Sequence, residues 1–179
     1  GVQTCALPIS NGRINLLSFQ NGGSAIKEFG PKSGRACNDL AWNPIRHNYL
    51  AAAYDKNRSD HAILIYDTNI SPPTMDAKSK GKRQDHIGAA IEIGMGEACQ
   101  SLAWFHTNPE TLVAGMNMKN LKIFDLRLSE SSGPKPVKSN VSRLPFGLCV
   151  DPHLDYRVAS FYEGMGFDRF VSLVIDSKS

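Results

Sequence analysis

The four cysteines are the residues in this sequence most able to bind a metal ion, but their spacing does not favour a metal site. No two of them form a C-x-x-C pair, which is the spacing typical of zinc ligands. Three of them, Cys37, Cys99 and Cys149, occupy the same place in successive units of an internal repeat. Equivalent places in separate units lie too far apart to share one ion. We therefore expect these cysteines to pack in the core as small hydrophobic residues and predict no metal site.

The five histidines are the next candidates, because histidine is the most common acid or base in enzymes. A catalytic histidine needs a nucleophile and an orienting carboxylate within reach, and no G-x-S-x-G or H-E-x-x-H motif is present. His153 is the best placed, within Asp151-Pro-His-Leu-Asp155, although that segment is more typical of a solvated turn. The sequence predicts no catalytic residue and no cofactor, and therefore no enzyme. The histidines are His47, His61, His86, His106 and His153.

Two segments could in principle bind phosphate groups. Gly94-Met-Gly96 lacks the third glycine of a dinucleotide loop and leads into a predicted strand, so no helix N-terminus stands behind it. Asn21-Gly22-Gly23 is more simply a turn. Lys78, Lys80, Lys82 and Arg83 form the only basic cluster, in a chain whose net charge is +3. A solvated loop is favoured for this cluster over a nucleic-acid site.

The composition is that of a folded, water-soluble chain. Hydrophobic residues make up 41% of the 179 residues and charged residues 21%. No run approaches the roughly 18 apolar residues that a membrane helix needs, and the first ten residues lack the basic start of a signal peptide. We therefore expect a reducing, cytoplasmic setting.

An internal repeat organises the whole sequence. Cys37-Asn-Asp-Leu-Ala-Trp42 returns as Cys99-Gln-Ser-Leu-Ala-Trp104, and Ile63-Leu-Ile-Tyr-Asp67 returns as Leu121-Lys-Ile-Phe-Asp125. A third copy begins with Phe146-Gly-Leu-Cys-Val-Asp-Pro152. An earlier end piece, Gly12–Ser18, resembles the late strand of a unit whose beginning is missing. Such periodicity predicts a fold built from repeated units.

Each unit reads as short strands joined by turns. Asn38–Trp42 alternates apolar and polar residues, Tyr49–Ala53 is rich in small residues, and Ala62–Tyr66 is rich in β-branched and aromatic residues. No convincing helical period interrupts them. We predict an all-β, partial WD-repeat β-propeller of about three blades of antiparallel strands, which is not closed.

Aromatic and acidic residues have structural roles in this interpretation. Trp42 and Trp104 are expected to be core aromatics between neighbouring blades. Asp67 and Asp125 follow an aromatic residue at a strand end, where a buried carboxylate can accept hydrogen bonds from a tight turn. Residues 70–93 and 129–140 read as irregular loops, which are where partners usually dock on a rigid scaffold.

Several of these segments resemble one family closely. Cys37–Pro44, Ile123-Phe-Asp-Leu-Arg127 and Arg157-Val-Ala-Ser-Phe-Tyr-Glu-Gly164 are similar to the N-terminal propeller of the Mios, or missing-oocyte, WD-repeat proteins. The resemblance runs from about residue 11 to residue 164. We therefore divide the chain into 1–10, which has no counterpart in the family, 11–164, the partial propeller, and 165–179, a divergent tail in which Phe170–Asp176 could still form a strand. About three units cannot close a ring, so apolar faces are expected on the terminal sheets.

The resemblance implies a non-catalytic scaffold whose partners are other protein subunits of a SEA/GATOR-type complex. That complex relays amino-acid availability to TOR complex signalling. It also implies a cytoplasmic location, peripheral at the lysosomal or vacuolar membrane. One alternative is an unrelated WD-repeat adaptor, or a nucleic-acid-binding propeller that uses the basic loop. Another is an enzyme on a propeller scaffold, which the Ala, Leu and Val residues expected to point toward the axis disfavour.

Overall fold

Antiparallel sheets account for all the regular structure in the part of the chain that can be described. The computed structural model describes residues 4–8, 11–18, 22, 24–71, 86–128, 137–141, 144–154, 157–162 and 171–174. These residues form fourteen strands in four separate sheets, and none of the sheets closes on itself. The predicted all-β, unclosed propeller architecture is confirmed. Within the same residues, no helix is long and apolar enough to cross a bilayer.

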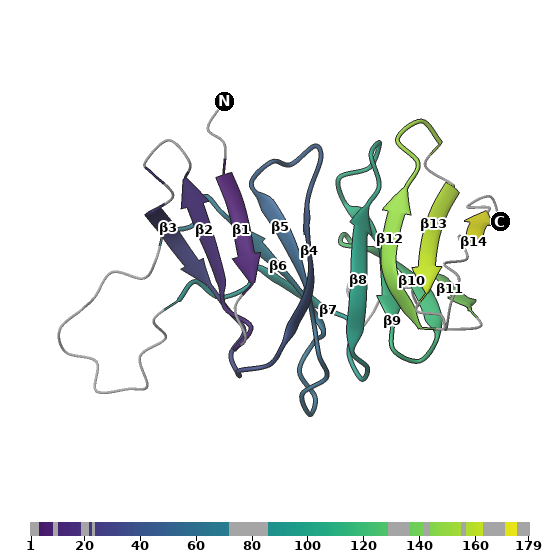
Figure 1. Ribbon diagram of the computed structural model, residues 1–179, viewed down its shortest axis with the longest axis horizontal. Coiled ribbons are helices and arrows are strands. Elements are labelled where there is room, and N and C mark those ends of the chain that lie inside the picture. Colours follow the sequence, from purple (N-terminus) through teal and green to yellow (C-terminus); the bar gives the residue numbers. More distant parts are fainter. Residues whose placement is uncertain are drawn as a thin grey trace.

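The four sheets follow one another along the chain (Figure 1). Sheet A contains β1 (Thr4–Pro8), β2 (Ile14–Ser18) and β3 (Ser24–Phe29). Sheet B contains β4 (Cys37–Trp42), β5 (Tyr49–Tyr54), β6 (Ile63–Asp67) and β7 (Ile91–Ile93). Sheet C contains β8 (Cys99–Trp104), β9 (Thr111–Met116), β10 (Asn120–Asp125) and β11 (Val137–Asn140). Sheet D contains β12 (Pro145–Val150), β13 (Arg157–Tyr162) and β14 (Val171–Val174).

The first strands of sheets B, C and D lie side by side. β4 contacts β8, and β8 contacts β12, so these three strands form the inner row of the molecule (Figure 1). In each sheet the chain then passes outward through successive antiparallel neighbours. This radial arrangement is that of propeller blades. Sheet A begins with β1 at its edge, and no described strand pairs with the edge of β1 that faces away from β2.

Each inner strand has the same irregularity, which fixes the alignment of the repeats. The register against the second strand shifts between Cys37 and Asp39, between Cys99 and Ser101, and again between the first and third residues of β12. These β-bulges make Asp39 and Ser101 equivalent positions. Trp42 pairs with Leu50, and Trp104 pairs with Leu112, so the two tryptophans are also equivalent.

The apolar core lies between the sheets rather than within one of them. One cluster joins sheets A and B through Ile14, Phe29 and Tyr66, and a second joins sheets B and C. A third, smaller cluster joins sheets C and D around Val113 and Val158. Residues 51–53, all alanine, are fully buried: Ala51 and Ala53 face sheet C and Ala52 faces sheet A, in the close packing that their small size suggested. Burial of apolar faces between successive sheets is the main force that holds such a stack together.

The two segments expected to be irregular contain one short strand each. Ile91–Ile93 is β7, and Val137–Asn140 is β11. Both are outermost strands with one paired edge, so few of their residues are buried and the apolar alternation that marks inner strands is weak. The short β14 likewise lies within the tail for which a strand was predicted.

Gly115 on β9 provides a test of how closely sheets C and D pack. A Cβ atom at Gly115 would lie 2.5 Å from Ser101 Oγ and 2.7 Å from Pro145 Cγ. We expect Gly115→Ala to lower the free energy of unfolding by about 1–3 kcal/mol, because the inner strands of both sheets would have to move. At Gly147 the three atoms nearest to the added Cβ all belong to the ring of Phe161, which is 49% exposed and so has solvent to move into. Denaturant unfolding should therefore show a smaller loss for Gly147→Ala, and an equal or larger loss would contradict this packing.

Candidate interaction surface

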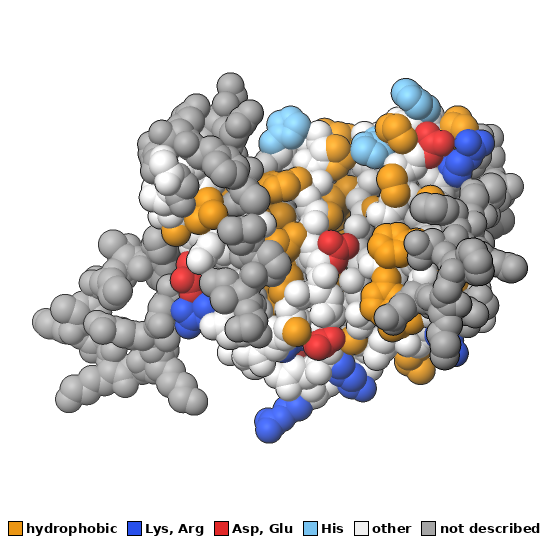
Figure 2. Space-filling model, viewed as in Figure 1, with side chains coloured by type: hydrophobic (Ala, Val, Ile, Leu, Met, Phe, Trp, Pro, Cys, Tyr) orange, Lys and Arg blue, Asp and Glu red, His pale blue; other side chains and the backbone are white. Residues whose placement is uncertain are grey.

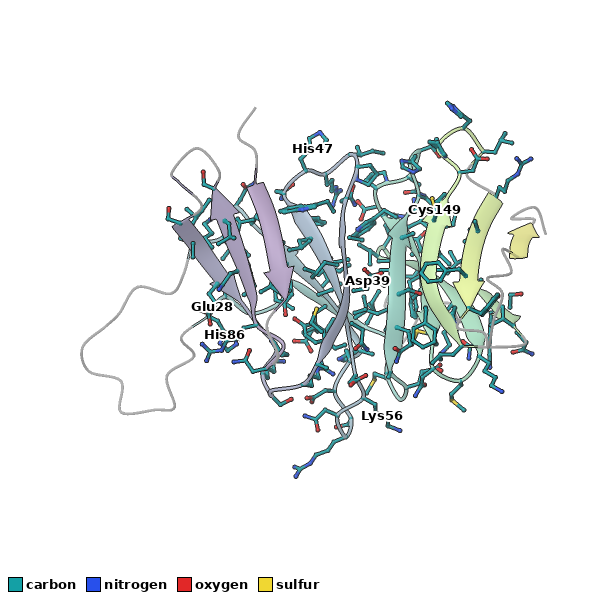
Figure 3. The ribbon with its side chains drawn as sticks, in the orientation of Figure 1. Glu28, Asp39, His47, Lys56, His86 and Cys149 are labelled. Carbon is teal, nitrogen blue, oxygen red and sulfur yellow. The ribbon has the colours of Figure 1, made fainter. Side chains whose placement is uncertain are left out.

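Polar side chains on β4 join sheet B to sheet C. Asp39 Oδ2 accepts a hydrogen bond from Leu102 N at 2.8 Å, and its Oδ1 accepts one from Leu40 N at 2.8 Å. Asn38 Nδ2 donates to Cys99 O at 2.8 Å. Burial raises the pKa of the Asp39 carboxyl, while the two backbone N–H groups act in the opposite direction. Figure 3 shows Asp39 in the inner row, between β4 and β8. Asp39 therefore links two neighbouring blades through a hydrogen bond.

A hydrogen bond from the equivalent position also links sheets C and D, but a hydroxyl group takes the place of the carboxylate. Ser101, which is equivalent to Asp39, donates from its Oγ to Pro145 O at 3.1 Å. Sheets B and C are also joined in the turns that follow β4 and β8: Asn43 Nδ2 donates to Pro109 O at 2.8 Å, and Arg46 forms an ion pair with Glu110. These polar contacts between sheets were not predicted from the sequence. The signal for them is a polar residue that recurs at the third position of each Cys-x-Asp/Ser-Leu-Ala-Trp segment.

The two tryptophans, expected to be core aromatics, differ in burial. Trp104 is 4% exposed and donates from its indole Nε1 to Ala41 O on β4 at 2.9 Å, so this prediction is confirmed. Trp42 is 36% exposed, and the prediction that it is buried is wrong. The cause is the neighbouring sheet: β4 covers Trp104, whereas no described strand takes the corresponding place beside Trp42.

The predicted turn-binding carboxylates are found in the expected role. Asp67 accepts a hydrogen bond from Asn69 N at 2.9 Å, and Asp125 accepts one from Arg127 N at 3.0 Å. Asn48 Nδ2 also donates to Asp67 at 2.9 Å, which ties two turns of sheet B together. Hydrogen bonding to the Arg127 guanidinium lowers the pKa of Asp125. Both carboxylates hold a turn in place, but they are partly exposed and not buried as predicted, because each turn lies at a strand end on the surface.

The three described cysteines do not share one environment. Cys37 and Cys99 are equivalent residues at the start of an inner strand, but Cys149 pairs with Ala159 beyond the bulge and corresponds to Ala41. The prediction that Cys149 occupies the same place and lies in the core is therefore wrong, and Cys149 is exposed. Cys99 is buried, and Cys37 is half-buried. Burial raises the pKa of both thiols, to about 12 for Cys37.

Thiol labelling should separate these environments. At pH 8, in a Cys5→Ser background, we expect iodoacetamide to modify Cys149 rapidly, Cys37 slowly and Cys99 only after unfolding, because the thiolate is the reactive species. Peptide mass spectrometry over time measures the three rates separately. Modification of native Cys99 as fast as Cys149 would contradict the packing between sheets B and C.

The histidines lie in or beside turns, as expected. His61 Nδ1 lies 3.3 Å from Glu92 Oε2, and His86 Nε2 is 3.1 Å from Pro31 O. The remaining three belong to the turns that follow β4, β8 and β12. In the described part of the chain, no three His, Cys, Asp or Glu side chains are placed to hold a metal ion. A small cavity of about 70 Å³ lies beside Lys32, Arg35 and His61, where Glu92 forms an ion pair with Lys32 and contacts His61.

The glycine turn at 94–96 leads into a buried ion pair that the sequence analysis missed. Gly94 and Gly96 have positive φ values of 80° and 90°, which allows the tight turn before β8. The next residue, Glu97, is 6% exposed and pairs with Lys122 on β10. Asn120 Nδ2 also donates to Glu97 at 3.5 Å. The turn thus holds a carboxylate against β10 and has a structural role.

The two rims of the stack carry different exposed side chains. His47 follows β4 at one rim, and Lys56 lies at the opposite rim, in the turn between β5 and β6 (Figure 3). Figure 2 shows histidines along the first rim, with charged side chains at its right-hand end, and Lys and Arg side chains without histidine along the second. Each rim also exposes apolar residues: Ile45 is 44% exposed at the first, and Met118, in the turn between β9 and β10, is 68% exposed. Rims of this kind are where rigid scaffolds usually present their contacts.

Most of the segments expected to make contacts or to bind nucleic acid lie outside the described residues. The basic cluster of Lys78, Lys80, Lys82 and Arg83 belongs to residues 72–85, and much of the second loop belongs to residues 129–136. Asn21 and Gly23 of the predicted glycine turn also fall outside. The roles assigned to these segments remain predictions.

Comparison with known proteins agrees with this arrangement of sheets. The profile of a family described as "MIOS, WD40 repeat" matches residues 4–169, beginning inside the N-terminal segment set apart above. The chain is 39% identical over 177 residues to "GATOR2 complex protein MIOS" of Danio rerio and 36% identical over 181 residues to "GATOR2 complex protein MIOS-A" of Xenopus laevis. Each match covers 89% of this chain and 20% of the relative.

A more distant relative extends the comparison to insects. The chain is 30% identical over 151 residues to "GATOR2 complex protein Mio" of Drosophila melanogaster, which covers 84% of this chain and 15% of that protein. The chain thus spans about a fifth or less of the length of these relatives. The resemblance noted from the repeat motifs is confirmed: this chain belongs to the MIOS WD40-repeat family.

Proposed function

We propose that this propeller acts as a non-catalytic scaffold that binds neighbouring subunits of a GATOR2-type complex. The similarity to relatives named as GATOR2 complex proteins carries the proposal. The way in which the sheets are joined supports it. Hydrogen bonds and ion pairs from Asp39, Asn43 and Arg46 hold sheets B and C in fixed relation, so that their turns form a rigid surface.

The proposal includes what the complex does and where it acts. Through it, the protein would help to relay amino-acid availability to TOR complex signalling, from the cytoplasm and peripherally at the lysosomal or vacuolar membrane. Asp67 and Asp125 hold turns, and Trp104 packs between sheets; these are the roles expected of residues in a scaffold.

Co-purification of the full-length protein tests the proposal. The full-length protein, tagged and expressed in cells of the species it comes from, should recover other subunits of a GATOR2-type complex, which mass spectrometry would identify. Ile45→Asp and Met118→Asp are matched probes of the two rims, because both side chains are exposed and neither substitution should disturb the core. Loss of one or more subunits with either variant supports docking through this propeller. The proposal fails if the wild type recovers no such subunit, or if both variants recover the full set unchanged.

A further inference from the structure

The rim of the stack that carries Lys56 (Figure 3) presents cations without acidic partners. We call it the basic rim. Its three turns are residues 55–62, 94–98 and 117–119. Lys56 and Arg58 are exposed in the first turn, and Lys119 is exposed in the third. Within the part of the chain that is described, none of these three side chains forms an ion pair, so they give the rim an outward positive charge.

The acidic residues of the same turns are already bonded within the protein. Asp55 and Asp60 each accept a hydrogen bond from a neighbouring side chain. Glu97 is buried and paired with Lys122. At the opposite rim, by contrast, three arginines have acidic partners: Arg46 pairs with Glu110, Arg127 with Asp125 and Arg157 with Asp151. Of the two rims, the basic rim is therefore the one whose charge favours an acidic partner.

Two methionines add apolar surface to the basic rim. Met95 is 54% exposed in the second turn, and Met118 is 68% exposed in the third, next to Lys119. They are the most exposed of the large hydrophobic side chains in the described residues. Methionine is flexible and polarisable, so it adapts to apolar groups of different shapes. The rim can therefore contact a partner through both charge and apolar surface.

Hydrogen bonds between the turns hold the basic rim in one arrangement. Ala62 N donates to Gly94 O at 3.0 Å, which joins the first turn to the second. Asn117 N donates to Ala98 O at 3.0 Å, which joins the third turn to the second. A partner would meet a preformed surface, so little ordering of this chain would oppose binding.

The backbone conformations of Arg58 and Lys119 show that the turns do not need their charge. Their φ values are 49° and 56°, and among the described residues they are the only non-glycine residues with positive φ. Asn and Gly adopt this left-handed conformation more readily than Arg or Lys. Backbone outliers of this kind are often found where a side chain has a function. Either turn could form without a cation, which leaves both charges available to a partner.

We propose that the basic rim binds an acidic segment of a neighbouring protein subunit, with Asp or Glu on both sides of a large apolar residue. The carboxylates would pair with Lys56, Arg58 and Lys119. The apolar side chain would pack against Met95 or Met118. This inference rests on the proposed function, because it names the chemistry of one docked neighbour. A protein is favoured over a nucleic acid, since the three turns contain no Phe, Tyr or Trp on which bases could stack.

An acidic peptide tests the charge of the rim on the full-length protein. The probe is the fluorescein-labelled octapeptide Glu-Asp-Leu-Glu-Asp-Leu-Glu-Asp, and fluorescence anisotropy measures its binding. Arg58→Asn combined with Lys119→Asn should weaken binding by roughly 3- to 20-fold, because two exposed ion pairs are lost. The unfolding midpoint in urea should not fall, since Asn suits a positive φ. Arg127→Asn, at the opposite rim, is the control and should leave the binding unchanged.

Two further probes test the class of partner. The octapeptide with Ser in place of both Leu residues should bind roughly 2- to 5-fold more weakly, since it cannot pack on the methionines. Equal affinities for the two peptides would overturn the apolar contact. Oligothymidine of the same length should lose less affinity in the double variant than the acidic peptide does. A larger loss would assign the rim to a nucleic acid, and unchanged binding of the acidic peptide by the double variant would likewise overturn the proposal.

Photo-crosslinking in cells identifies the natural occupant. p-Benzoylphenylalanine in place of Met118 of the full-length protein should crosslink to a segment of another subunit in which Asp and Glu outnumber Lys and Arg. Adding Arg58→Asn and Lys119→Asn should lower the crosslink yield by roughly threefold or more. A crosslink to a neutral or basic segment, or no crosslink to another subunit, would overturn the inference. If subunits of the complex still co-purify in that case, the proposed function stands, whereas recovery of no subunit by the wild type would overturn the proposed function itself.

Discussion

Replacing Trp104 with alanine is expected to lower the free energy of unfolding by about 3–5 kcal/mol, the usual cost of truncating a buried aromatic residue. The side chain is 4% exposed, packs between sheets B and C and donates a hydrogen bond to Ala41 O. Truncation would leave a cavity between the two sheets and remove the hydrogen bond from the indole to Ala41 O. Since neighbouring sheets stabilise one another, the loss should affect the whole stack.

Trp42→Ala is the matched control, because it removes the same side chain from the equivalent position of the neighbouring strand. Trp42 is 36% exposed, so its truncation should lower the free energy of unfolding by roughly half as much as that of Trp104, or less. Urea unfolding followed by circular dichroism measures both losses without relying on tryptophan fluorescence. Equal losses for the two variants would contradict the difference in packing between Trp104 and Trp42.

The strands could be predicted from the sequence because their signals are local. Asn38–Trp42 alternates polar and apolar residues and ends at a turn, and the structure places a strand at Cys37–Trp42. Tyr49–Ala53 was likewise predicted to within one residue of β5, Tyr49–Tyr54. The pairing of these strands followed from the repeat, because strands that recur in the same order with short turns pair with their neighbours.

The burial of individual residues could not be predicted in the same way. Trp42 and Trp104 have the same local sequence, and their difference arises from which strand the neighbouring sheet contains. The error at Cys149 had a different origin, since cysteines were aligned by residue type. Aligning Pro152 with Pro44 instead places Cys149 opposite Ala41, on the face of the inner strand that points toward the following sheet. The proline turn was the better marker, because it fixes where the inner strand ends.

The polar contacts between sheets were the least predictable part of the structure. Asp39 bonds to the backbone of a strand more than sixty residues away, and Glu97 pairs with a lysine on β10. No spacing rule connects such partners, because their contact depends on the stacking of sheets and the bulge in each inner strand. A repeated polar residue in an otherwise apolar segment indicates that a partner exists, but it does not identify it.

The ion pair of Glu97 and Lys122 should be the second most sensitive point in the molecule. Glu97→Leu alone is expected to lower the free energy of unfolding by about 3 kcal/mol, near the lower end for breaking a buried pair on one side. The side chains of Lys122 and Glu97 are 17% and 7% exposed, so the ammonium group left behind would be only partly solvated. Lys122→Leu alone leaves the Glu97 carboxylate buried with only the long contact to Asn120, and we expect a similar loss.

The double variant distinguishes the electrostatic cause from simple loss of packing. When Glu97→Leu and Lys122→Leu are combined, no unpaired buried charge remains, so stability should return to within about 1 kcal/mol of the wild type. The exposed pair of Arg127 and Asp125 is the control, and Arg127→Ala should not change the unfolding midpoint measurably, because Arg127 is largely in solvent. Chemical unfolding of the wild type, the two single Leu variants and the double variant completes the cycle. If the losses of the two single Leu variants simply add in the double variant, the two side chains contribute through independent packing, and the turn before β8 is not held by charge.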